Sequence, residues 1–213
     1  MSRAPTRDLL CGLLLAALAP CPTAARADAA VEYVDTEYQF RFRFPAGWER
    51  QELPVPGEGG EVRVAVKSLA EPMFVMAVVS PIGESISREE FARSPDRDAV
   101  VARMIERALD QVHGKMARDL AASQTIVAGK HARASDVGIA FSIDTTQITP
   151  DGATAVAGVH VVPFGKRYSI ALLMVSRVDG AREKETRRRL FDSFQVHGER
   201  LPGVTPSRRG SGG

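Results

Sequence analysis

The second half of the chain is dominated by strand-like segments that are separated by turn signals. These segments cover roughly residues 125–127, 132–146, 153–163 and 167–176. Asp151-Gly152, between the second and third segments, is typical of a tight hairpin turn. Phe164-Gly165-Lys166 separates the third segment from the fourth in the same way. Because successive strands joined by short turns pair antiparallel, the sequence predicts an antiparallel β-sheet as its main layer.

The first half of the chain adds further strands of two kinds. Residues 38–44 alternate aromatic with polar side chains, and residues 62–66 carry valine at every second position. This alternation is typical of strands with one buried face. Residues 73–80 and 168–175 are apolar almost throughout, which favours central strands that are covered on both faces.

Helical periodicity is confined to three segments. Ser87 followed by Glu90 is the pattern of a capping box and predicts a short helix that ends before Pro95. A longer helix is expected over residues 96–121, where apolar side chains recur at helical spacing and Gly114 is a point of fraying or bending. A last helix is expected over residues 181–194, with a thin apolar face.

This order of elements predicts an α+β fold, an antiparallel β-sheet with helices on both faces. We expect a single domain over residues 35–198, after a short lead-in at residues 28–34. The tail at residues 199–213 is rich in Gly, Pro, Ser and Arg. It has too few apolar residues to offset the entropy of ordering, so we expect it to be disordered.

Residues 1–27 have the pattern of a signal peptide. Arg3 and Arg7 precede an apolar run over residues 9–19, and Ala25-Arg26-Ala27 forms a cleavage site. The apolar run is shorter than the roughly 20 residues that span a bilayer. We therefore expect cleavage near Ala27, a periplasmic or secreted protein, and no transmembrane segment. Peripheral contact with a membrane remains an open alternative.

Both cysteines lie inside this leader, at Cys11 and Cys21. Cys21 also permits a lipoprotein interpretation, but Pro20 stands where that signal has a small residue, so cleavage near Ala27 is preferred. The processed chain would then have no disulfide, no thiolate metal site and no cysteine nucleophile.

The charges of the expected mature chain nearly balance. Residues 28–198 carry 22 basic and 24 acidic side chains, although the precursor as a whole has a formal net charge of +2. A nucleic-acid-binding domain would instead show a strong basic excess. We therefore expect no nucleic-acid partner.

Both ends of the predicted domain resemble the PsbP-like domains. The first strand ends in FRFPAGWE, and the last strand and helix read GKRYSIALLMVS and RRLFDSFQV, while IVAGKHA is similar to the middle region of these domains. The group includes an extrinsic subunit of photosystem II, the DcrB-like envelope proteins and a nuclear import factor that binds the Ran GTPase. The resemblance implies an α/β/α sandwich used for binding and assembly. It transfers no binding residue to this chain.

Individual chemical side chains give no recognisable catalytic or metal-binding pattern. The four histidines are far apart in sequence: His113, His131, His160 and His197. None has a partner at a diagnostic zinc spacing, and we expect them mostly to serve packing. Trp48 is best explained as a core anchor that closes the first strand. The sequence pattern therefore indicates no catalytic, cofactor-binding or metal-binding residue, and we expect no cofactor.

The remaining polar candidates also have structural explanations. Three serines lie near the ends of predicted elements, namely Ser80, Ser85 and Ser176. None of them lies in the G-x-S-x-G motif of a nucleophile elbow. The acidic pairs Glu89-Glu90 and Asp96/Asp98 fall in first turns of helices, where carboxylates interact favourably with the helix dipole. The basic run at residues 187–189 is interpreted as a solvated helix face, with contact to anionic lipid as the alternative.

Three functions follow as hypotheses. The first is a non-enzymatic exported envelope protein that docks to another envelope protein, through the loop at residues 53–60 and the open edges of the sheet. The second is a hydrolase with a dispersed active site, in which at least two of Ser, His, Asp or Glu converge in a deep pocket. The third is a carrier of a small molecule or lipid, which requires an apolar cavity.

Overall fold

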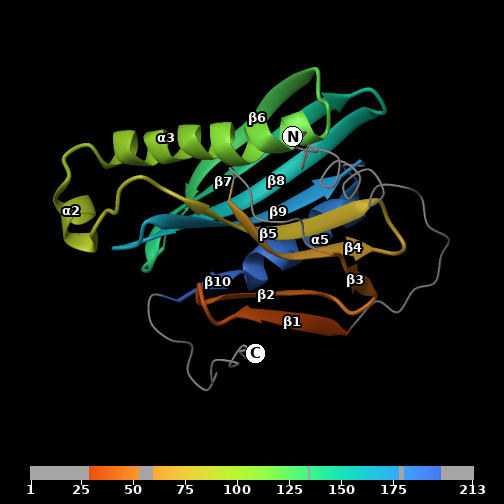
Figure 1. Cartoon of the computed structure of the whole chain (residues 1–213), viewed down its shortest axis with the longest axis horizontal. Helices are drawn as coiled ribbons and strands as arrows, with labels where there is room; N and C mark the ends of the chain where they lie inside the picture. Colours follow the sequence, from red (N-terminus) through yellow and green to blue (C-terminus); the bar gives the residue numbers. More distant parts are fainter. Residues whose placement is uncertain (1–28, 53–59, 134, 178–179, 198–213) are drawn as a thin grey trace, which may run out of the picture.

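The computed structural model describes residues 29–52, 60–133, 135–177 and 180–197. The predicted leader, most of the loop at residues 53–60 and the predicted tail lie outside these residues. The α+β class is confirmed, since strands form most of the structure and a few helices pack against them (Figure 1). No helix among the described residues is long and apolar enough to cross a membrane.

Seven strands form one antiparallel sheet in the order β3-β4-β5-β9-β8-β7-β6. Their bounds are Trp48–Arg50 (β3), Glu61–Ser68 (β4), Met73–Pro81 (β5), Gln124–Arg133 (β6), Gly138–Thr149 (β7), Gly152–Pro163 (β8) and Tyr168–Ser176 (β9). The two continuous apolar segments become β5 and β9, which pair with each other in the centre. Nearly all their side chains are buried, as the sequence predicts.

A second, three-stranded sheet has the order β1-β2-β10. It consists of Ala30–Asp35 (β1), Phe40–Pro45 (β2) and Gln195–Val196 (β10). The alternating phenylalanines of β2 are buried, while Arg41 and Arg43 on its other face are not. The sequence predicts this alternation, but it does not reveal that β2 belongs to a separate sheet.

The first face of the large sheet is covered by a long helical segment (Figure 1). It comprises Arg97–Ala108 (α3), a π-helical turn at Leu109–His113 (η1) and Gly114–Asp119 (α4), preceded by the short helix Arg88–Arg93 (α2). The helical segment predicted over residues 96–121 is present, and its regular α-helical geometry is interrupted at Leu109–His113, directly before Gly114, where bending is expected. Met104 and Ile105 pack over β7, and Val112 and Met116 pack over β5 and β9.

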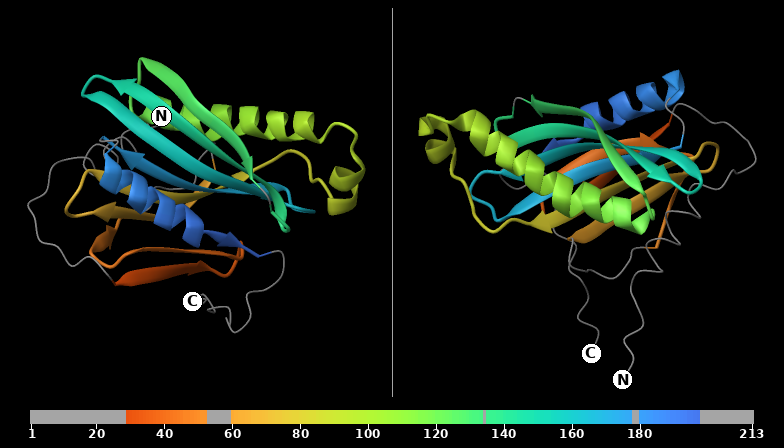
Figure 2. Two further views of the ribbon diagram at one scale, coloured as in Figure 1. Left: turned by 180° about the vertical axis from the view of Figure 1, so that it is seen from behind. Right: turned by 90° about the horizontal axis from the view of Figure 1, so that it is seen from above.

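The second face of the sheet has a mixed cover. The helix Ala181–Ser193 (α5) and the three-stranded sheet both lie on this side (Figures 1 and 2). Leu190 of α5 joins Phe40, Phe42 and Phe44 in one core cluster with inward side chains of β5 and β9. A single helix beside a small sheet therefore takes the place of the helical layer expected on this face. Trp48 packs partly buried at the border of the same cluster, where it begins β3 of the large sheet rather than closing β2.

Strand β6 differs from its prediction. The sequence indicates a short strand at residues 125–127 and a new strand from residue 132. In the structure β6 is continuous, and the pairing with β7 shifts register between Val127 and Gly129. The register shift therefore marks a β-bulge inside one strand, and the true turn follows Arg133.

Candidate functional site

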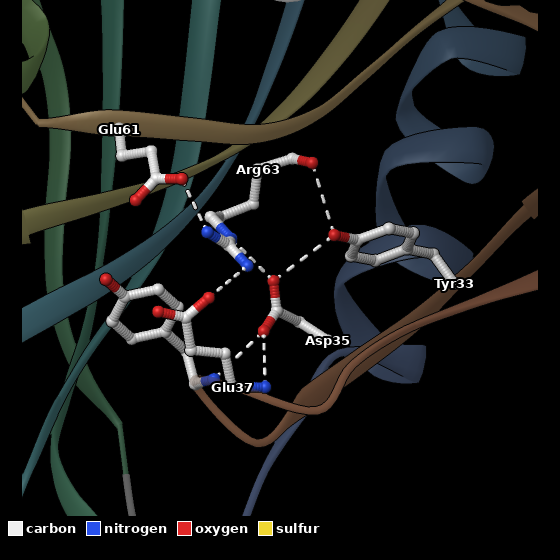
Figure 3. Close-up of polar contacts among 6 residues, drawn as sticks. Tyr33, Asp35, Glu37, Glu61 and Arg63 are labelled. Carbon is white, nitrogen blue, oxygen red and sulfur yellow. Dashed lines mark hydrogen bonds and ion pairs between the residues drawn. The ribbon is translucent and has the colours of Figure 1, made fainter. Parts of the chain in front are cut away.

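Three places in the structure gather polar or unpartnered groups: a junction around Arg63, a buried pair of histidines, and the outer edge of β6. Arg63 projects from β4 toward the turn between β1 and β2 (Figure 3). Its Nε lies 2.7 Å from Oδ2 of Asp35, and its Nη2 lies 2.8 Å from Oε2 of Glu37. Glu61 pairs with the remaining Nη1. One guanidinium thus engages three carboxylates.

Asp35 connects this junction to the backbone of the turn. Its Oδ1 accepts hydrogen bonds from the backbone N–H groups of Glu37 at 3.0 Å and Tyr38 at 2.9 Å. The hydroxyl of Tyr33 donates to Oδ2 at 3.2 Å. Burial, and then the nearby Asp35 carboxylate, raises the pKa of Tyr33 to about 12. The phenol therefore stays protonated, and the junction is suited to fastening the small sheet onto β4 rather than to supplying a base or nucleophile.

The second site is the pair His113 and His160, which the fold brings together from η1 and β8. Their Nε2 atoms lie 3.3 Å apart, and both side chains are buried, with 1% and 0% exposed. The ring of His160 stacks on Phe141 at a centroid distance of 5.1 Å. The sequence spacing of the histidines does not predict this contact. Their role as core side chains matches the prediction that histidines mostly serve packing.

The surrounding hydrogen bonds determine how the protons are placed in the pair. Thr145 Oγ1 donates to the carbonyl of Val156 and accepts from the amide of Gln147, both at 3.3 Å. The remaining acceptor position of this hydroxyl then receives Nδ1–H of His113 at 3.2 Å. Nε2 of His113 is consequently an acceptor for Nε2–H of His160. Nδ1 of His160 is buried without a hydrogen-bond partner among the described residues.

Desolvation keeps both imidazoles neutral near pH 7. Burial lowers the pKa of His113 to about 4. For His160, burial and then the neighbouring His113 lower the pKa well below its ordinary value. No acidic residue contributes to either shift, so the pair lacks the carboxylate that would orient a general base. With both rings closed off from solvent, the pair belongs to the core rather than to the surface.

Glycine at position 158 makes this pairing possible. A Cβ atom at Gly158 would lie 2.8 Å from Nε2 of His160 and 3.4 Å from Nε2 of His113. The space normally taken by a side chain on β8 is thus occupied by the two rings. Two sequence signals point to the pair in retrospect: His160 interrupts a run of apolar strand residues, and His113 lies four residues after Leu109 on the apolar helix face.

The other histidines and the predicted polar candidates remain separate. His131 is exposed on β6, and His197 is half-buried after β10. Ser80 and Ser176 are buried on strands, whereas Ser85 is exposed before α2. No group of three or more His, Cys, Asp or Glu side chains in the described part of the chain is arranged to hold a metal ion.

The acidic and basic side chains singled out in the sequence lie on helices, where they cap helix ends or form ion pairs. Glu89 and Glu90 lie in the first turn of α2, and Glu90 completes the predicted capping box with Ser87. Asp96 caps α3. Of the basic run on α5, Arg188 and Arg189 pair with Glu185, and Arg187 lies 3.9 Å from Asp144.

The third site is the outer edge of β6. This strand pairs only with β7, so its other edge is unpaired by any described strand. Nine of its ten residues are exposed, with Gly129 the exception. Ile126 and Val127 are 45% and 42% exposed, the highest values among the large hydrophobic residues that the structure describes. The opposite edge of the sheet, β3, has only three residues.

Together these features define an α+β domain of the PsbP-like fold, with closed polar sites in its core and one long open sheet edge. The solution structure of cyanobacterial PsbP (CyanoP) from Synechocystis sp. PCC 6803 has this fold, with a TM-score of 0.53 and 17% sequence identity. The match covers 84% of this chain and 99% of CyanoP. At this identity the likeness shows the fold alone, and it confirms the fold that the sequence resemblance implies.

Two further solved structures are more distant. The Ran-binding protein Mog1p from Saccharomyces cerevisiae gives a TM-score of 0.44 at 7% identity, covering 79% of this chain and 95% of its own. LpqN from Mycobacterium tuberculosis, involved in cell envelope biogenesis, gives 0.44 at 11% identity, covering 79% and 86%. No protein-family model and no curated protein matches the sequence.

Proposed function

We propose that this protein is an exported, non-catalytic binding module that docks to another protein of the cell envelope. The observation that carries the proposal is the open edge of β6, ten residues long and exposed almost throughout. Folded proteins normally protect such an edge, because its free N–H and C=O groups pair readily with another chain. A long accessible edge is therefore suited to binding a partner strand.

The state of the polar sites supports a binding role over a catalytic one. The histidine pair is closed within the core, and the Arg63 junction uses its charges to hold two sheets together. The hydrolase alternative requires converging groups that a substrate can reach. The signal-peptide pattern of residues 1–27 supports export, and an envelope protein is therefore the proposed partner.

Co-purification tests the proposal. The full-length chain, tagged at its C-terminus, is expressed in the source cells, and the envelope fraction is solubilised and passed over an affinity column followed by size exclusion. We expect one envelope protein to co-elute in stoichiometric amount. Elution of the chain alone as a free monomer from envelope fractions would contradict a docking function.

A further inference from the structure

We propose that the outer edge of β6 binds an extended acidic segment of the partner as an eighth strand of the sheet. This inference rests on the proposed docking function and adds the chemistry of the partner. It depends on three properties of β6, namely the length of its free edge, the arrangement of its side chains on two faces, and its unbalanced positive charge.

The pairing register assigns each side chain of β6 to a face. Val127 and Lys130 pair with Thr145 and Ile143, whose side chains are buried beneath the helical layer. Because paired residues share a face, Val127 and Lys130 lie on the helix side of the sheet. Ile126, His131 and Arg133 lie on the opposite side by the same register.

Both faces of β6 therefore have the same order of side chains. An exposed apolar residue comes first, Val127 on one face and Ile126 on the other. A cation follows, Lys130 on the first face and Arg133 on the second. On each face an exposed apolar side chain thus precedes a cation along the strand, whichever face an incoming side chain meets.

The positive charge of this edge has no counterpart within the described residues. β6 contains no acidic residue, and neither Lys130 nor Arg133 forms an ion pair with another described side chain. Asp144, the one acidic residue of the neighbouring strand β7, pairs with Gly129 and lies 3.9 Å from Arg187. Opposite charges facing each other across strands are favourable, whereas like charges are not.

The same charge disfavours a second copy of this chain as the occupant. Two β6 edges brought together would combine four uncompensated cations. An acidic partner segment instead pairs with residues 124–127 and 129–133 on either side of the bulge. In the antiparallel orientation, its acidic residues come first and its apolar residues follow.

Photo-crosslinking from the bulge tests this directly. p-Benzoylphenylalanine replaces Ala128 in the full-length chain, and a control protein carries it at Ala102, which is exposed on α3. Both are irradiated in the source cells, and the crosslinked peptides are identified by mass spectrometry. We expect Ala128 alone to capture the partner, within a segment whose first half is acidic. Capture of a second copy of this chain, or capture only from position 102, would overturn the inference.

Charge reversal provides an independent measurement. The double variant K130E/R133E is compared with R93E/R103E, which reverses two exposed arginines on α2 and α3. A synthetic peptide with the sequence of the crosslinked segment is the probe. We expect K130E/R133E to bind the peptide at least tenfold more weakly than the unmodified protein does, and R93E/R103E to bind it with unchanged affinity. Binding by the unmodified protein should weaken as the salt concentration rises. Equal binding by both variants would overturn the acidic assignment.

These outcomes separate the two proposals. A stoichiometric partner that crosslinks elsewhere, or through a basic segment, leaves the docking function standing and removes the β6 assignment. If no partner is recovered and no crosslink forms at either position, the docking function fails and the β6 inference fails with it.

Discussion

At the residue scale, the buried histidine pair shows how one small side chain permits a polar contact inside a core. His113 and His160 are hydrogen-bonded through their Nε2 atoms, and Gly158 leaves the space for both rings. Thr145 completes the chain of hydrogen bonds. The free energy that this arrangement contributes depends on both imidazoles remaining uncharged, since burial of an unpaired charge is strongly unfavourable.

The pair makes stability depend on pH. The pKa of His113 is about 4 in the folded state, against an ordinary value of 6.5, so below pH 6.5 the unfolded chain binds a proton that the folded chain does not. Stability is therefore complete above pH 6.5 and falls as the pH decreases toward 4. His113 alone accounts for about 3 kcal/mol over this interval, at about 1.4 kcal/mol per pKa unit.

Urea denaturation at pH 7.5 and pH 5.5 checks this dependence before most carboxylates titrate. We expect the wild-type protein to lose at least about 1 kcal/mol between these values. H113Q, with one imidazole fewer in the core, should lose less, whereas H131Q, which removes an exposed imidazole, should lose as much as the wild type. Identical losses in H113Q and the wild type would show that the pair does not titrate as described.

Gly158 offers a second prediction at this scale. G158A places a methyl group 2.7 Å from Leu173 Cδ2 and 2.8 Å from His160 Nε2, so the pair or the sheet must shift. We expect a loss of about 1–3 kcal/mol in the free energy of unfolding, as for other overpacked cores. G47A is the matched control, because nothing lies within 4 Å of its added Cβ. A G158A protein as stable as G47A would mean that the rings are not packed against this glycine.

At the element scale, the Arg63 junction fastens the hairpin of β1 and β2 to the large sheet. Asp35 is 3% exposed and depends on Arg63 for its charge partner. The same carboxylate holds the turn through the N–H groups of Glu37 and Tyr38. Loss of the guanidinium therefore affects both the contact between the sheets and the turn that leads into β2.

R63M tests this connection. Removing one partner of a buried ion pair leaves an uncompensated charge at Asp35, and we expect a loss of about 3–5 kcal/mol in the free energy of unfolding. The double variant R63M/D35N should be more stable than R63M alone, since it removes that buried charge. R188M, in an exposed ion pair on α5, serves as the control and should leave the denaturation midpoint unchanged. Additive effects of R63M and D35N would contradict direct coupling.

Local patterns predicted the individual elements well and their long-range partners poorly. The alternating phenylalanines of β2, the capping box of α2 and the apolar strands β5 and β9 follow from short-range periodicity. The separate small sheet depends on pairing between β2 and β10, more than 150 residues apart in sequence. Periodicity carries no information about such a contact.

The candidate sites also depend on long-range contacts that local sequence patterns do not reveal. The length and exposure of β6 are not evident from the sequence, because residues 125–127 and 132–146 are predicted as separate strands, whereas in the structure a register shift near Ala128 lies inside one continuous strand. The histidine pair depends on β8 passing beneath η1, which places residues 47 positions apart within hydrogen-bond distance. The sequence does not predict the Arg63 junction, because the three carboxylates that pair with Arg63 come from two strands and a turn.

At the scale of the whole molecule, the proposed function requires the chain to leave the cytoplasm. The signal-peptide pattern predicts that the exported protein begins at Asp28. Mass spectrometry of protein from the envelope or medium of the source cells measures this N-terminus. C21S should be processed like the wild type, because Cys21 lies within the removed leader. A lipid-modified N-terminus at Cys21 would contradict cleavage near Ala27 and place the protein on a membrane.

The central claim is that the long edge of the sheet carries the binding site, and backbone hydrogen exchange measures this edge directly. The amides of β6 are compared in the isolated protein and in the purified complex with its partner. The account predicts slower exchange at Gln124–Arg133 on binding, because free edge N–H groups acquire strand partners, with exchange in α3 unchanged. Unchanged exchange throughout β6 in a complex that protects another surface would contradict the claim.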